Sequence, residues 1–160
     1  MINHDGDPTH ELVLVDGLST EGVVLAHREA LQVLRACIDA AYLDAYSDHA
    51  WPPAVMHSYE RVMSLAREAV NDGTRPRRAD PGMGIDIDVR DDAQFGLLLD
   101  LAPHTIQAEG WRGDRLVFSA SDSGASLWIA VTADQMVELM SRLDARGIPP
   151  TAFAVQSRNC

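Results

Sequence analysis

Lysine is absent from this chain, and all 13 basic residues are arginine. Such a bias indicates a high-GC bacterial genome and says nothing about mechanism. Acidic residues outnumber the basic ones: 24 aspartates and glutamates against 13 arginines give a formal net charge of −11. A uniformly acidic surface repels phosphate backbones, so nucleic-acid binding is not expected. The charge favours a basic protein partner, although acidity that serves only solubility is the simpler interpretation.

Cysteine is scarce as well: Cys37 falls in a predicted helix and Cys160 is the last residue. A disulfide between them would require the tail to fold back onto that helix, so we expect two free thiols. No apolar run approaches the roughly 18 residues of a membrane span. Residues 1–10 lack the basic and apolar regions of a signal peptide. The sequence therefore predicts no membrane partner and a cytoplasmic location.

The chain does contain enough apolar material for a globular core. A hydrophobic fraction of 46% is typical of a globular protein, and the length of 160 residues predicts a single domain over residues 1–160. We divide it into a flexible tail (1–10), a mainly helical part (11–70), a connecting loop (71–84) and a strand-rich part that ends in a helix (85–160). The loop is recognised by its glycines, prolines and arginines.

The clearest folding signal is a β-hairpin followed by a helix, in residues 116–143. Apolar and polar residues alternate in both strands of the hairpin. A two-residue turn at Ser123-Gly124 pairs Phe118 with Ile129 and places the apolar residues of both strands on one face. The helix that follows begins with a capping box of Thr132 and Gln135. It continues with one apolar stripe, made of Met136, Leu139, Met140 and Leu143.

The strand before this hairpin, residues 105–110, is expected to extend the same apolar face. A three-residue loop at Trp111-Arg112-Gly113 places Ile106 and Ala108 beside the apolar side chains of the hairpin.

In the first half, residues 11–15 predict a strand, and helical spacing predicts helices over residues 27–45 and about 52–70. The short connection between these helices favours an antiparallel helical hairpin.

In the second half, residues 85–89 alternate like a strand. Residues 91–102 fit a strand or a helix, and residues 152–155 fit an edge strand. We therefore predict an α+β fold: a mostly antiparallel four- to five-stranded sheet, an N-terminal helical hairpin, and a C-terminal helix packed on the sheet.

Candidate catalytic and metal sites are weak. Alternate carboxylates at Asp86 and Asp88, with Asp91 and Asp92 close by, are a possible cation site, but a solvated strand face is the preferred interpretation. The sequence contains no zinc motif and no nucleophile elbow. We considered His49, His57 and His104 for zinc, and Ser121, Asp122 and His104 as a catalytic triad. We predict no catalytic residue, no metal and no cofactor.

The tryptophans are a better indication of function. Trp111 and Arg112 lie at a predicted hairpin tip, and Trp128 points away from the apolar face, on the side that carries Glu109 and Ser119. That second face is either covered by the helical hairpin or used to bind a partner. Aromatic residues exposed on a surface are typical binding residues. We therefore nominate Trp111, Arg112, Trp128 and Glu109 for partner binding.

Two functions remain from different classes. The first is a small acidic interaction protein without catalytic activity, of the immunity, antitoxin or inhibitor kind, which binds a protein partner. The second is a domain with the helix-grip order of elements that binds or converts a small apolar ligand in an internal cavity. Self-association within a larger assembly is a third interpretation.

Overall fold

A computed structural model describes residue 8 and residues 10–156 of the chain. The strands are β1 (His10–Leu14), β2 (Ala40–Leu43), β3 (Ile85–Ile87), β4 (Gln107–Arg112), β5 (Arg115–Ser121), β6 (Ser126–Val131) and β7 (Phe153–Val155). The α-helices are α1 (Thr20–Leu34), α2 (Met56–Asn71), α3 (Asp92–Leu101) and α4 (Ala133–Ala145). Within these described residues, no helix is both long enough and apolar enough to cross a lipid bilayer.

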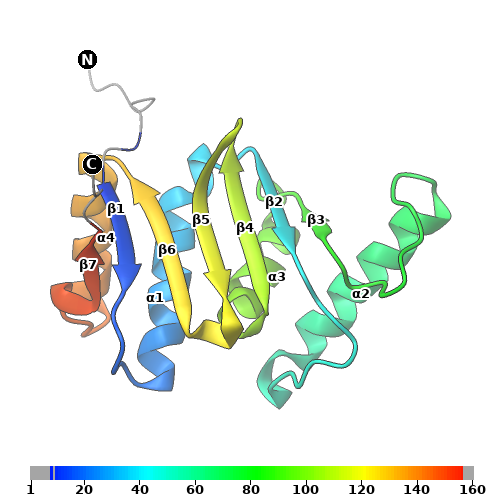
Figure 1. Cartoon of the computed structure of the whole chain (residues 1–160), viewed down its shortest axis with the longest axis horizontal. Helices are drawn as coiled ribbons and strands as arrows, with labels where there is room; N and C mark the ends of the chain where they lie inside the picture. The colour runs from blue at the N-terminus through cyan, green and yellow to red at the C-terminus, as the bar shows by residue number, and fades with distance from the viewer. Residues whose placement is uncertain (1–7, 9, 157–160) are drawn as a thin grey trace.

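All seven strands form one antiparallel sheet in the order β3-β2-β4-β5-β6-β1-β7. Helices α1, α3 and α4 lie behind the sheet in Figure 1, and α2 extends past the β3 edge, where it contacts α3. No helix of the described chain covers the front face of the sheet (Figure 1). The α+β class and the antiparallel sheet are confirmed, whereas the predicted strand number of four to five is wrong.

The predicted helical hairpin is also wrong. Helix α1 begins earlier than expected, at Thr20, and ends at Leu34, after which a short 3₁₀ turn leads into strand β2. Ala41 and Leu43 are buried while Tyr42 between them is exposed, which is the two-residue period of a strand. The apolar spacing in residues 27–45 fits both periods, and pairing with β3 and β4 decides in favour of the strand.

The central hairpin has the predicted register, because Phe118 pairs with Ile129. Its turn is closed by the backbone N–H of Ala125, which donates to the carbonyl oxygen of Asp122 (3.2 Å). Ser123 and Gly124 both have positive φ, 56° and 94°, as a type I′ turn requires. Glycine is also required at position 124 for space, since a Cβ there would lie 2.6 Å from the carbonyl oxygen of Pro103.

Strands β4 and β5 are joined differently from the prediction. Arg112 pairs with Arg115, so the loop has two residues instead of three, and a bulge between Gly110 and Trp111 shifts the register. Ala108 is buried as expected. Ile106 is 44% exposed, so its predicted inward position is wrong. It precedes β4, where the chain leaves a 3₁₀ helix, and it therefore lies outside the sheet alternation.

Helices α3 and α4 are both capped at their N-termini by side chains that the sequence analysis named. Residues 91–102, which fitted either a strand or a helix, contain α3, and the side chain of Asp91 caps it by accepting from the backbone N–H of Gln94 (2.9 Å). Helix α4 begins with the predicted capping box between Thr132 and Gln135.

A buried carboxylate joins the first and last helices. Glu29 of α1 is 4% exposed and contacts Arg142 of α4 at 3.2 Å and Arg146, the residue after α4, at 3.1 Å. Both guanidinium groups are partly exposed, so they remain hydrated on their outer side. The buried carboxylate therefore depends on Arg142 and Arg146 for its hydrogen bonds, whereas the partly exposed guanidinium groups also reach water.

Replacing Glu29 by glutamine is expected to lower the free energy of unfolding by about 1–2 kcal/mol, because both charge-assisted contacts weaken while their burial remains. Urea denaturation would measure the change. Glu138→Gln is the matched control, since Glu138 pairs with the same Arg142 from an exposed position. Its loss should be below about 0.5 kcal/mol. Equal losses in the two variants would contradict a structural role for the buried carboxylate.

Candidate functional site

The uncovered face of the sheet carries a row of seven side chains in register, one from each strand. Paired residues in an antiparallel sheet point to the same side. Following the pairings across the sheet gives the row Asp86, Tyr42, Glu109, Ser119, Trp128, Val13 and Ala154. Their sequence neighbours on the opposite face, such as Leu12 and Ile129, are buried in the core. This row therefore runs along the solvent side, and we call it the front row.

Glu109 lies near the middle of the front row and is held from both sides. Its carboxylate accepts a hydrogen bond from Gln107 Nε2 (3.0 Å) and another from Trp111 Nε1 (3.0 Å). Gln107 Nε2 also lies 3.5 Å from Ser119 Oγ. Two neighbouring side chains, Gln107 and Trp111, thus fix the position of one negative charge, and the indole ring of Trp111 is fixed with it.

Trp128 lies two strands away from Glu109, between Ser119 and Val13 in the front row. It is half-buried, as is Trp111. The expected alternative, in which N-terminal helices cover Trp128, is wrong, because those helices pack on the opposite face (Figure 1). Three of the four nominated residues, Glu109, Trp111 and Trp128, therefore share one uncovered surface.

Arg112, the fourth nominated residue, is separated from the others. It ends β4 beside the turn, and its charge acts on the Cys37 thiol that follows α1. Burial raises the pKa of this thiol, and a hydrogen bond from Gln135 and the nearby Arg112 oppose that rise. The nomination of Arg112 for partner binding stays a prediction. Cys160 lies outside the described residues.

Tyr42 belongs to this surface and was missed from the sequence. It is 42% exposed and stands between Asp86 and Glu109 in the front row. A depression of about 210 Å³ lies beside it, lined by Tyr42, Leu43, Asp44, Gln107 and Glu109. The depression contains two carboxylates and no basic residue. The alternation of Ala41 and Leu43 around Tyr42 fits a strand, but the same stretch also fits a helical stripe, and only pairing with β3 and β4 decides between them.

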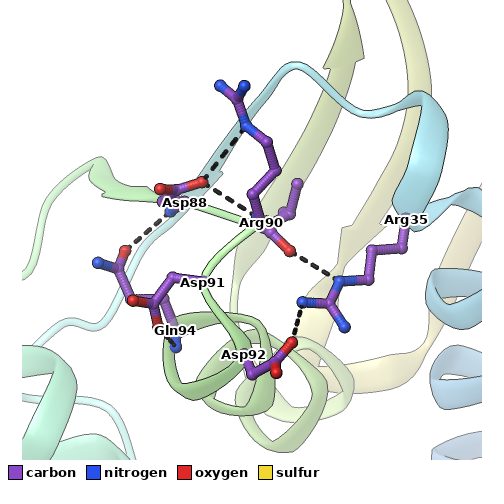
Figure 2. Close-up of polar contacts among 7 residues, drawn as sticks. Arg35, Asp88, Arg90, Asp91, Asp92 and Gln94 are labelled. Carbon is purple, nitrogen blue, oxygen red and sulfur yellow. Dashed lines mark hydrogen bonds and ion pairs between the residues drawn. The ribbon is translucent and has the colours of Figure 1, made fainter.

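The acidic cluster considered for a cation is used for local structure (Figure 2). Asp88 accepts from the backbone N–H of Arg90 (3.0 Å), Asp91 caps α3, and Asp92 pairs with Arg35 at 2.6 Å. Asp86 is placed elsewhere, in the front row. Among residue 8 and residues 10–156, no three His, Cys, Asp or Glu side chains are arranged to hold a metal ion.

Two of the histidines considered for zinc lie together, but not as a catalytic pair. His49 Nε2 is 2.7 Å from the carbonyl oxygen of His104 and 3.5 Å from Ser123 Oγ. A carbonyl only accepts hydrogen bonds, so Nε2 carries the proton and cannot act as a base toward Ser123. His57 is exposed on α2, away from this pair in the chain.

A third histidine near this pair, His27, was not considered from the sequence. It is fully buried in α1, and burial lowers its pKa to about 4. His27 Nδ1 donates to the carbonyl oxygen of Val23 (2.7 Å), while Nε2 has no hydrogen-bond partner within the described chain. Burial also lowers the pKa of His104, which acts on His27 through its charge. Burial therefore favours the neutral form of the His27 ring, as for a histidine of a structural core.

No family model, no curated protein and no solved structure matches this chain. Function must therefore be inferred from surface chemistry. The front row and its neighbour Trp111 combine two indoles, a phenol and a fixed carboxylate on a face without helices. Aromatic residues surrounded by polar groups are typical of protein-binding surfaces.

Proposed function

We propose that this protein binds a basic protein partner through the uncovered face of its sheet, without catalysing a reaction on it. The hydrogen-bonded unit of Glu109 and Trp111 carries this proposal, because it presents a fixed negative charge beside a fixed aromatic ring. Fixed groups lose little conformational entropy on binding. Tyr42 and Trp128 extend the surface on either side of that unit.

Charge favours a basic partner over a second copy of this chain. The two ionisable acids of the front row, Asp86 and Glu109, both carry negative charge, and the chain as a whole carries a formal charge of −11. Two such faces repel each other, whereas a basic surface is attracted and steered toward them. Immunity proteins, antitoxins and inhibitors that mask a basic protein are the class that fits this chemistry.

The side chains behind the sheet support this proposal over the small-molecule alternative. Phe118, Leu31 and Leu98 are fully buried between the sheet and the helices, where a helix-grip domain would hold its ligand. The order of elements also differs from that of a helix-grip domain, since α2 separates β2 from β3 and β7 follows α4.

A photo-crosslinking residue at Ser119, in the centre of the front row, would test the proposal. We expect it to trap a basic protein, which is then purified and titrated calorimetrically against the unlabelled chain. Trp128→Ala should weaken binding by about 30-fold or more, as expected for a buried aromatic contact. Ser119→Arg should weaken it without removing a core contact, and added salt should weaken the wild-type complex.

Val137→Ala is the matched control, because Val137 is 68% exposed on α4, behind the sheet. It should bind as the wild type does. The proposal fails if Val137→Ala weakens binding as much as Trp128→Ala. It also fails if the crosslink traps only a second copy of this chain, an acidic protein or no protein.

A further inference from the structure

Four arginines of this acidic chain gather in one groove, at the end of the molecule away from β7. The groove lies between the C-terminal end of α2 and the loop that follows it, and it has a volume of about 310 Å³. Figure 1 shows this end of α2 projecting beyond the edge strand β3, with the loop turning back along it. The arginines are Arg67, Arg75, Arg77 and Arg78. We call this feature the arginine groove.

Arg75 is the structural part of the groove. It is 8% exposed and donates hydrogen bonds to the carbonyl oxygens of Gly84 (2.8 Å), Pro81 (3.1 Å) and Met83. These bonds close the loop into a fixed wall. Gly82 attaches the same wall to the end of β2, where its carbonyl oxygen accepts from the backbone N–H of Ala45 (2.7 Å). The groove is therefore formed before any ligand arrives.

The other three arginines form no ion pair within the described part of the chain, although Arg67 donates a hydrogen bond to Ser64 Oγ (3.4 Å). Arg67, Arg77 and Arg78 are exposed, and no carboxylate of the described residues lies within 4.0 Å of their guanidinium groups. The nearest acids in the loop have other partners. Asp72 accepts from the side chain and the backbone of Thr74, and Asp80 accepts from the backbone N–H of Gly82.

Capping of α2 does not explain the arginines. The last carbonyl oxygens of this helix already accept from backbone N–H groups of residues 72–75. Burial lowers the pKa of Arg75, and repulsion from the positive charge of Arg78 lowers it further. Only Asp86 opposes this effect on Arg75. The groove therefore has a local excess of positive charge.

We propose that the arginine groove binds a small organic phosphate. Guanidinium groups form paired hydrogen bonds with phosphate oxygens, and Arg77 and Arg78 are free to do so. Ala66, Val70 and Pro81 provide an apolar surface for the organic part of the ligand. The overall charge of −11 does not prevent this, because charges beyond about 8 Å are largely screened at physiological salt.

Calorimetric titration of the whole chain with pyrophosphate and with adenosine monophosphate, at physiological salt, tests the site. Both should bind saturably, and adenosine without phosphate should not. Arg77→Ala combined with Arg78→Ala should weaken binding by about tenfold for each arginine removed. Exchanging both for lysine should restore part of the affinity, since lysine keeps the charge without the forked geometry.

Arg61→Ala is the matched control, because Arg61 is an exposed arginine of the same helix that does not line the groove. It should bind both phosphates as the wild type does. Equal weakening by Arg61→Ala would show diffuse attraction to surface charge and overturn the proposal. Absence of saturable binding to either phosphate at millimolar concentrations would overturn it as well. So would sulfate binding as tightly as the two phosphates, which indicates an adventitious ion only.

Discussion

Replacing Phe118 by alanine is expected to lower the free energy of unfolding by about 3–5 kcal/mol. Phe118 is the largest of the side chains with no exposed surface, and it lies on β5 at the centre of the sheet. The Cβ of Phe118 already lies within 3.3 Å of the position that a Cβ on Gly110 would occupy. Neighbouring strands are therefore too tightly paired to close the cavity that the missing ring would leave.

Chemical denaturation would measure this loss, with Ser119→Ala as the matched control one residue along the same strand. Ser119 lies on the uncovered face, so its replacement should change stability by less than about 0.5 kcal/mol. The contrast between the two variants tests which face of β5 forms the core. Similar losses from both would mean that the front face is packed as well, contrary to the structure.

Acidification is expected to destabilise the fold through His27. The pKa of this ring is lowered from 6.5 to about 4 in the folded chain. Above pH 6.5 both states are neutral and the full stability is present. As the pH falls from 6.5 toward 4, the unfolded chain takes up a proton that the folded chain rejects, so the free energy of unfolding decreases. The whole interval corresponds to about 3 kcal/mol.

His27→Phe isolates this contribution. Phenylalanine is of similar size and removes a buried nitrogen that lacks a partner, so stability at neutral pH should change little. Denaturation at pH 7 and at pH 5 should show a smaller decrease in the variant than in the wild type, by about 2 kcal/mol. His57→Gln, at an exposed position, is the control and should keep the wild-type decrease. An unchanged decrease in His27→Phe would exclude this ring as the source.

Local chemistry explains which parts of the fold could be predicted from the sequence. The turn at Ser123-Gly124 and the capping box of Thr132 and Gln135 both depend on residues a few positions apart. Their geometry is nearly independent of the rest of the chain. Such signals fixed the central hairpin, its register and helix α4.

Non-local strand pairing explains the main error of the sequence-based prediction, which extended a helix over residues 27–45 and so covered strand β2. Strand β2 pairs with residues more than forty positions later, Ile85–Ile87 and Gln107–Arg112. Its own residues also fit a helical stripe, and sequence spacing alone does not choose between the two periods. The same error hid Tyr42, the most exposed aromatic side chain of the front row.

The alternation of side chains along a strand located part of the candidate site, because this alternation holds whichever strand pairs with it. It placed Glu109, Ser119 and Trp128 on one face, as observed. The arginine groove could not be predicted from strand alternation, because it lies between a helix and a loop. Its residues are visible in the sequence as a basic loop, but only Arg75, bonded to three carbonyl oxygens, turns that loop into a wall.

The sheet ends on both sides in a strand of only three residues, β3 and β7. Each offers few unpaired backbone groups, and the exposed side chain of Asp86 places a charge on the β3 edge. Strand-by-strand addition of a peptide or of another sheet is therefore disfavoured at either side. Side-chain contacts of the front row are therefore the association that the described sheet favours.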